Sequence, residues 1–179
     1  MIRAVVLLIM TIWVSSVFAY PNVHHHNSSS LTTALRTGID TNGNVLYLCQ
    51  AKLFGSIQPG KTWAGYGRCN VPYGGKEYIV DQFTIPNQRS FGQFNWERDQ
   101  RGALQIGKDT NGNPLFVCQV NFNGSIQPGK TWPGYNHCNI SYAGREVITD
   151  NFRVLSRPQE LIVGSRIPGR QSNNIHLHY

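Results

Sequence analysis

Apolar and polar residues alternate along two nine-residue stretches of the chain, 45–53 and 114–122. A period of two is typical of a strand with one buried face. Residues 69–73 and 138–142 alternate in the same way, so we expect the cysteines in these four strands to face inward. The apolar positions of the two long stretches are Val45, Tyr47, Cys49, Ala51 and Leu53, and Pro114, Phe116, Cys118, Val120 and Phe122.

These stretches belong to an internal repeat. Residues 34–83 align with residues 103–152 at a constant offset of 69 positions without a gap, and residues 55–63 are identical to residues 124–132. Agreement of this length indicates a duplication, and two copies are too few for a long solenoid or a propeller.

Turn signals separate the predicted strands in both copies, and no segment of the mature chain has sustained helical periodicity. The sequence therefore predicts an all-β fold of two tandem antiparallel repeats related by pseudo-two-fold symmetry. The predicted turns are Asn42-Gly43, Pro59-Gly60 and Gly74-Gly75, with Asn111-Gly112, Pro128-Gly129 and Ala143-Gly144 at the matching positions.

The first residues predict export. Arg3 precedes an apolar run over residues 4–18, and Val17-Phe18-Ala19 fits a cleavage site, so residues 1–19 are predicted to be a signal peptide. The alternative is an uncleaved membrane anchor, but the run is shorter than the ~20 residues that a span requires. The remaining predicted boundaries are a lead-in over 20–33, a first repeat over 34–86, a linker over 87–102, a second repeat over 103–156 and a tail over 157–179.

Export makes disulfides the expected state of the four cysteines. We favour Cys49–Cys69 and Cys118–Cys138, one bridge per copy, each closing a 20-residue separation and contributing about 3 kcal/mol in the chain-entropy model. The other two pairings are also compatible with two-fold symmetry. A zinc site would need a cysteine and histidine spacing that is missing here. Three Asn-x-Ser sequons predict glycosylation, and they begin at Asn27, Asn123 and Asn139.

The chain is basic, with 16 Lys and Arg against 9 Asp and Glu. Removal of Arg3 with the signal peptide leaves 15 − 9 = +6. Such a charge suits sulfated or sialylated glycans and anionic microbial surfaces, although it also simply favours solubility. The positive residues are scattered along an exported chain, which disfavours nucleic acid as a partner.

Two aspartate–lysine pairs are the candidate binding residues. Asp40 precedes Lys61 by 21 positions, as Asp109 precedes Lys130, and each member lies at a turn signal. A carboxylate accepts hydrogen bonds from hydroxyls and an ammonium donates them, which together suit a vicinal diol of a sugar. The plainer alternative is a surface salt bridge or a turn cap. Nearby rings could stack on a sugar or belong to the core, and they are Trp63, Tyr66, Trp132 and Tyr135.

The sequence gives little support for metal binding or catalysis. The calcium-like Asp40-x-Asn42-x-Asn44 lacks the glycine and glutamate that an EF-hand loop needs. The histidines, at positions 24–26, 137, 176 and 178, have no partner at a fixed spacing. No nucleophile or phosphate-loop motif is present, and most acids form repeat-related pairs, unlike the differentiated carboxylates of a glycosidase. We expect no enzymatic activity, no metal and no cofactor.

Three segments together resemble the DM-nine repeat family of invertebrates. They are Gly-x-Asp-x-x-Gly-x-x-Leu-Tyr from Gly38, Gly-Ser-Ile-Gln-Pro-Gly-Lys at 55–61, and Cys-Asn-Val-x-Tyr-Gly-Gly-x-Glu at 69–77, with a matching set in the second copy. The resemblance covers about residues 31–155. It implies a compact β-sandwich-like body and similarity to mannose-recognising lectins of innate immunity, often dimeric. In those lectins the matching Asp and Lys contact the sugar, which implies that role for Asp40, Lys61, Asp109 and Lys130.

The chain departs from the family pattern at one strand. Cys49-Gln50-Ala51 and Cys118-Gln119-Val120 stand where a Val-Gly-Arg-Ala type segment is usual, so the fold carries over better than mannose specificity. Two sequons lie in the second copy, which suggests that glycans cover its site and that the first copy is the main binder. The competing hypothesis is a secreted, disulfide-bonded structural protein of saliva, venom or eggshell that binds no sugar.

Overall fold

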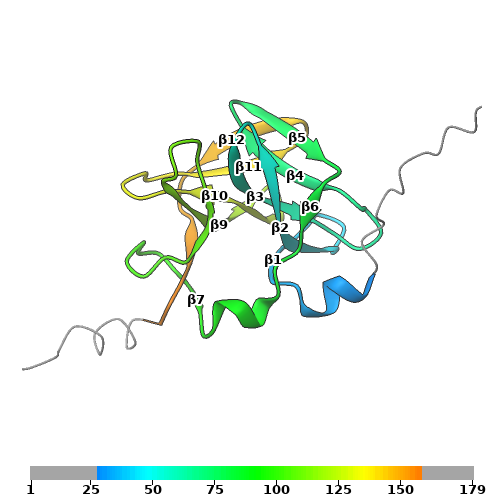
Figure 1. Ribbon diagram of the computed structural model, residues 1–179, viewed down its shortest axis with the longest axis horizontal. Coiled ribbons are helices and arrows are strands. Elements are labelled where there is room, and N and C mark those ends of the chain that lie inside the picture. Colours follow the sequence, from blue (N-terminus) through cyan, green and yellow to red (C-terminus); the bar gives the residue numbers. More distant parts are fainter. Residues whose placement is uncertain (1–27, 159–179) are drawn as a thin grey trace, which may run out of the picture.

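The computed structural model describes residues 28–158 (Figure 1). The predicted signal peptide, the Asn27 sequon, five of the six histidines and most of the predicted tail lie outside these residues. Two short 3₁₀ helices are present, η1 (Ser28–Thr33) and η2 (Gln88–Phe91). The strands are β1 (Arg36–Ile39), β2 (Val45–Leu53), β3 (Ser56–Thr62), β4 (Cys69–Tyr73), β5 (Lys76–Val80), β6 (Phe83–Thr84), β7 (Asn95–Glu97), β8 (Gln105–Lys108), β9 (Pro114–Phe122), β10 (Ser125–Thr131), β11 (Cys138–Tyr142), β12 (Arg145–Thr149) and β13 (Arg153–Ser156).

The strands close into a barrel. Every strand pairing is antiparallel, and β2 pairs with both β1 and β3, which closes the ring β2–β1–β10–β11–β12–β5–β4–β3. The predicted all-β class is therefore confirmed, but an eight-stranded barrel with additional strands replaces the expected sandwich. Closure removes the free edges that an open sheet would expose. Within the described residues, no helix has the length and apolar character that a membrane crossing requires.

The two sequence copies exchange strands within this barrel. Strand β1 of the first copy pairs with β10 of the second, with Ile39 opposite Ile126. Strand β8 of the second copy pairs with β3 of the first, with Lys108 opposite Ile57. Lys108 and Ile57 are the repeat equivalents of Ile39 and Ile126, at the offset of 69 positions. A side chain at Gly38 would overlap the Ile126 carbonyl, so this crossing requires glycine. Each copy thus supplies strands that complete the hydrogen bonding of the other.

Pro59-Gly60 and Pro128-Gly129 are not turns, contrary to our prediction. They lie inside β3 and β10, where Gly60 lets β4 approach: a Cβ there would be 2.6 Å from the Asn70 carbonyl oxygen. The turn between β2 and β3 is instead Phe54-Gly55, with φ of 48° and 78°, and the β9–β10 turn is Asn123-Gly124. Positive φ at both central residues is the geometry of a type I′ hairpin.

The buried face of the long strands changes side along each strand. In β2, Leu46 and Leu48 are buried before Cys49 and Ala51 are, so the prediction of one inward face over 45–53 is wrong for its first half. The leucine half of β2 belongs to a cluster shared by both copies, which comprises Leu35, Leu48, Leu104, Ile106, Val117 and Leu155.

The favoured disulfide pairing is confirmed. Cys49 bonds to Cys69 and Cys118 bonds to Cys138, with Cα atoms 5.9 and 6.0 Å apart. All four cysteines are fully buried, as predicted, and each bridge lies at the centre of an apolar cluster within its own copy. The bridges therefore link β2 to β4 and β9 to β11 without joining one copy to the other.

Candidate functional site

Asp40 closes the turn that follows β1. Its Oδ1 accepts the backbone N–H groups of Asn42 and Asn44, each at 2.8 Å, and its Oδ2 accepts the Asn44 side-chain amide at 2.8 Å. The side-chain hydrogen bond from Asn44, followed by the backbone ones, lowers the pKa of Asp40 below its usual value. Asp109 is held identically by Asn111 and Asn113. The predicted turn cap is therefore real, and its carboxylate is charged.

Lys61 is a buried lysine near the end of β3, with 6% of its surface exposed. Its Nζ donates to Gln127 Oε1 at 2.6 Å and to the Ser141 carbonyl, and both acceptors belong to the second copy. Burial lowers the pKa of Lys61 to about 8, although the nearby carboxylates Glu77 and Asp40 oppose this shift.

Lys130 occupies the corresponding position in β10 and is equally buried. Its Nζ donates to Gln58 Oε1 at 2.8 Å and lies 3.7 Å from Glu146 Oε1. Burial lowers the pKa of Lys130 to about 8 as well. Each lysine therefore reaches across to a glutamine of the other copy, an arrangement that the spacing of the sequence did not indicate.

Each aspartate–lysine pair lines one cavity. Asp40 and Lys61 border a cavity of about 210 Å³, and Asp109 and Lys130 border one of about 630 Å³. Both copies contribute to each wall. The first cavity also contains Trp63, Asn70, Glu77, Gln127 and Tyr142, and the second contains Trp132, Asn139, Glu146, Gln58 and Tyr73. The sequence correctly paired these aspartates and lysines, but it missed the contribution of the opposite copy.

A glutamate fixes the rim of each cavity. Glu77 Oε1 accepts the Asn70 amide at 2.8 Å, and its Oε2 accepts the backbone N–H of Gly144, in the turn of the other copy, at 2.7 Å. Glu146 makes the matching bonds to Asn139 and Gly75. The asparagine and the glutamate are the same in both copies of the repeat, and this agreement was the signal that could have identified Asn70 and Glu77 as site residues.

The aromatic residues form one stacked pair beside each cavity. Trp63 stacks on Tyr66 with ring centres 3.7 Å apart, and Trp132 stacks on Tyr135 at 3.8 Å. One face of each indole is thus covered by protein, while both indoles line the cavities. The Tyr66 hydroxyl donates to Asn70 Oδ1 at 2.8 Å, so the tyrosines brace the polar rim.

The two sequons of the second copy lie in different surroundings. Asn139 is 6% exposed, its amide oxygen accepts from Tyr135 and its amide nitrogen donates to Glu146, so a glycan there would require these contacts to open. Asn123 is exposed at the β9–β10 turn and borders a hollow together with Asp40. A glycan on Asn123 would therefore lie beside the first copy's aspartate, not the second copy's.

Metal ligands do not gather within residues 28–158: no group of three or more His, Cys, Asp or Glu side chains could hold an ion there. His137, the one histidine in this part of the chain, contacts Asp150 through Nδ1 at 2.6 Å. The hydrogen bonds that Asp40 accepts from Asn42 and Asn44 explain its turn motif without calcium.

Comparison with known proteins agrees with this architecture. The crystal structure of the nematode sperm cell motility protein MFP2B is similar, with a TM-score of 0.53 and 16% identity, over 71% of this chain and 43% of that one. The chain thus spans less than half of that protein, and the likeness concerns the fold alone. A search of curated proteins found no match. The family model described as DM9 repeat matches residues 14–80 and 40–149, and the chain belongs to this family.

Proposed function

We propose that this protein is a secreted, non-enzymatic carbohydrate-binding protein with two pseudo-symmetric sites, one at each aspartate–lysine cavity. The observation that carries the proposal is the buried ammonium of Lys61, and of Lys130, held at the wall of a cavity that also contains a charged aspartate and an indole. Burying an ammonium costs free energy, and a ligand-binding role gives a reason for that cost.

The remaining hydrogen-bonding capacity fits a diol. An ammonium has three donors, and Lys61 uses two of them on Gln127 and Ser141. A carboxylate has about four acceptor positions, and Asp40 uses three on the Asn42 and Asn44 groups. One donor and one acceptor remain at the same cavity. Two neighbouring sugar hydroxyls would satisfy both, with Trp63 beside the apolar face of the ring.

The family resemblance supports mannose-type glycans as the ligand class and recognition of microbial surfaces as the role. We propose that the second cavity is the stronger binder, which reverses the expectation from the sequence. Its volume of about 630 Å³ falls within the ~300–1,000 Å³ of ordinary ligand pockets, whereas 210 Å³ does not. The exposed Asn123 sequon also lies beside the first cavity. Dimerisation would raise the weak affinity of single sites through avidity.

A structural role is the second candidate, and one observation favours it. The bonds from Lys61 to Gln127 and from Glu77 to Gly144 join the two copies, so the same polar cluster could serve only to hold the barrel together. The protein would then be a disulfide-bonded component of a secretion such as saliva, venom or eggshell, without affinity for sugar.

Glycan-array binding of the full, oxidised chain separates the two functions. The test variant is Asp40→Asn with Asp109→Asn, because asparagine retains the turn-capping oxygen but loses the charge. Asp99→Asn is the matched control, since Asp99 is paired with Arg101 and lies outside the lining of both cavities. Wild-type binding that the double variant loses and the control keeps, at equal Tm, supports the lectin. Absence of glycan binding by all three proteins supports the structural role.

A further inference from the structure

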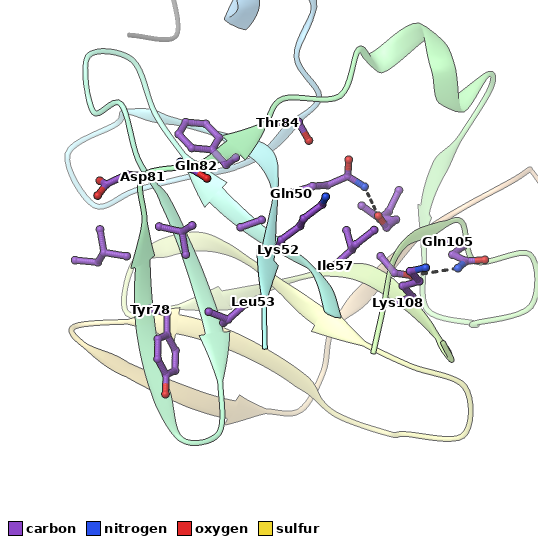
Figure 2. A pocket seen from close by; sticks show the side chains of 16 residues that line it. Gln50, Lys52, Leu53, Ile57, Tyr78, Asp81, Gln82, Thr84, Gln105 and Lys108 are labelled. Carbon is purple, nitrogen blue, oxygen red and sulfur yellow. Dashed lines mark hydrogen bonds between the residues drawn. The ribbon is translucent and has the colours of Figure 1, made fainter. Parts of the chain in front are cut away.

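A separate groove of about 1040 Å³ crosses the surface formed by β2, β3, β5, β6 and β8 (Figure 2). None of its lining residues borders the cavities of Asp40 or Asp109. We propose that this groove is a second binding site, and that its ligand is a linear sulfated polysaccharide.

Two lysines flank an isoleucine across the groove. The strand registers place Lys52 opposite Ile57 and Ile57 opposite Lys108, so the three residues form one row across β2, β3 and β8. Directly opposed residues share a face, and neighbouring strands are ~4.8 Å apart, which puts the lysine Cα atoms about 10 Å from each other. Both lysines are exposed, and Figure 2 shows them beside Ile57.

The rest of the lining suits a sugar chain. Gln50 and Gln105 donate their amide N–H groups to the backbone carbonyls of Ile106 and Gly107, which fixes both side chains along the groove. Ile57 adds a short apolar floor to this polar lining. Asp81 is the one acidic residue in the lining, and the Arg68 guanidinium lies 3.2 Å from its carboxylate, which offsets its charge.

The aromatic content argues against a nucleic acid in this groove. Single strands bind through rings on which bases stack. The rings in the lining are Tyr78 and Phe83; Phe83 is 8% exposed, and Tyr78 packs edge-on against Phe54 at 5.3 Å. Phe83 has too little exposed surface to stack on a base and Tyr78 already packs against Phe54, whereas sulfate groups require only cations and hydrogen-bond partners.

The second copy supplies a natural comparison. The corresponding row there is Asn121, Ile126 and Ile39, with the same registers between β9, β10 and β1. The fold therefore forms this row without either lysine, and the two positive charges are a property of one face only. Replacing Lys52 and Lys108 by the residues of the opposite row should leave the barrel intact.

The test measures binding of the full, oxidised chain to heparin by calorimetry and by the salt needed for elution from a heparin column. We expect Lys52→Asn with Lys108→Ile to weaken binding about tenfold, because the losses in affinity from two exposed charge contacts multiply. The charge-matched control is Lys76→Gln with Arg145→Gln, which removes two exposed cations from paired positions on β5 and β12. The control should retain wild-type binding, and the reciprocal pair Asn121→Lys with Ile39→Lys should strengthen it.

Several results would overturn the proposal. Equal weakening in the test and control pairs would mean that net charge alone attracts heparin. Equally tight binding of hyaluronate, which carries carboxylates but no sulfates, would refute the sulfate assignment. Tighter binding of single-stranded DNA with the same dependence on Lys52 and Lys108 would indicate a nucleic-acid site. The variant with Asp40→Asn and Asp109→Asn should bind heparin normally, so this site and the proposed lectin sites can fail separately.

Discussion

Raising the pH from 7 to 10 should stabilise this protein, because two buried lysines can then lose their charge. Burial lowers the pKa of Lys61 and of Lys130 from 10.5 to about 8. Between these values the unfolded chain binds more protons than the native state, so the free energy of unfolding rises with pH. Below pH 8 both states are protonated and the effect is constant.

The size of this effect follows from the two pKa values. Integrating from pH 7 to pH 10 gives about 2–3 kcal/mol for each lysine and on the order of 5 kcal/mol for the two. Burial also raises the pKa of Tyr66 and Tyr135, so ionisation of the unfolded chain above pH 10 acts in the opposite direction. The rise should therefore be measured between pH 8 and 10.

Guanidinium unfolding at a series of pH values provides the assay. The matched variant, Lys61→Met with Lys130→Met, removes both titrating groups but keeps similar side-chain length. Wild-type stability should increase across the window, and the stability of the variant should stay nearly flat. A wild-type profile that is flat or falls between pH 8 and 10 would refute the reasoning, as would a rise that persists in the methionine variant.

Three further predictions concern stability. Gly60→Ala should cost about 1–3 kcal/mol in chemical unfolding, because the new methyl group would lie 2.6 Å from the Asn70 carbonyl oxygen; an unchanged midpoint would contradict this close approach. Cys49→Ser with Cys69→Ser should lower the free energy of unfolding by about 3 kcal/mol, and reducing agent should then affect only the other bridge. Glu77→Leu should cost about 1–3 kcal/mol by leaving the buried Asn70 amide without its acceptor, while Asp99→Leu should cost less, because its bonds to Arg101 are exposed to water.

The sequence predicted the local features of this fold well. The period-two pattern identified the long strands, and the constant offset identified the equivalent positions. Burial and spacing favoured the correct cysteine pairing, because Cys49 and Cys69 lie on β2 and β4, which both pair with β3. The grouping of Asp40 with Lys61 followed from their equal spacing in both copies, although the turn expected at Lys61 is strand β3. These features depend on residues close together in the chain.

The features that the sequence did not predict depend on tertiary contacts, some within one copy and some between the two. Pro59-Gly60 has the composition of a turn, but Gly60 is needed for the close approach of β4 to β3, which is a tertiary requirement. Asn139 matches a glycosylation pattern, yet the approach of Tyr135 and Glu146 buries it. A one-dimensional pattern contains no information on which strand of the other copy covers a residue, so the barrel closure and the shared cavity walls were missed.

The exchange of strands between the copies determines the order in which this chain can fold during synthesis. Strand β1 bonds to β10, with Ile39 and Ile126 separated by 126 − 39 = 87 residues, so its partner leaves the ribosome only after most of the barrel has been made. The β2–β3 hairpin and the Cys49–Cys69 bridge, which links β2 to β4, involve only the first copy and can form earlier. A nascent chain ending at residue 86 would therefore contain one oxidised hairpin sheet with β1 and β3 still lacking a neighbour. Contacts of such long range slow folding, and early disulfide formation shortens the search by fixing half of the barrel before the other half arrives.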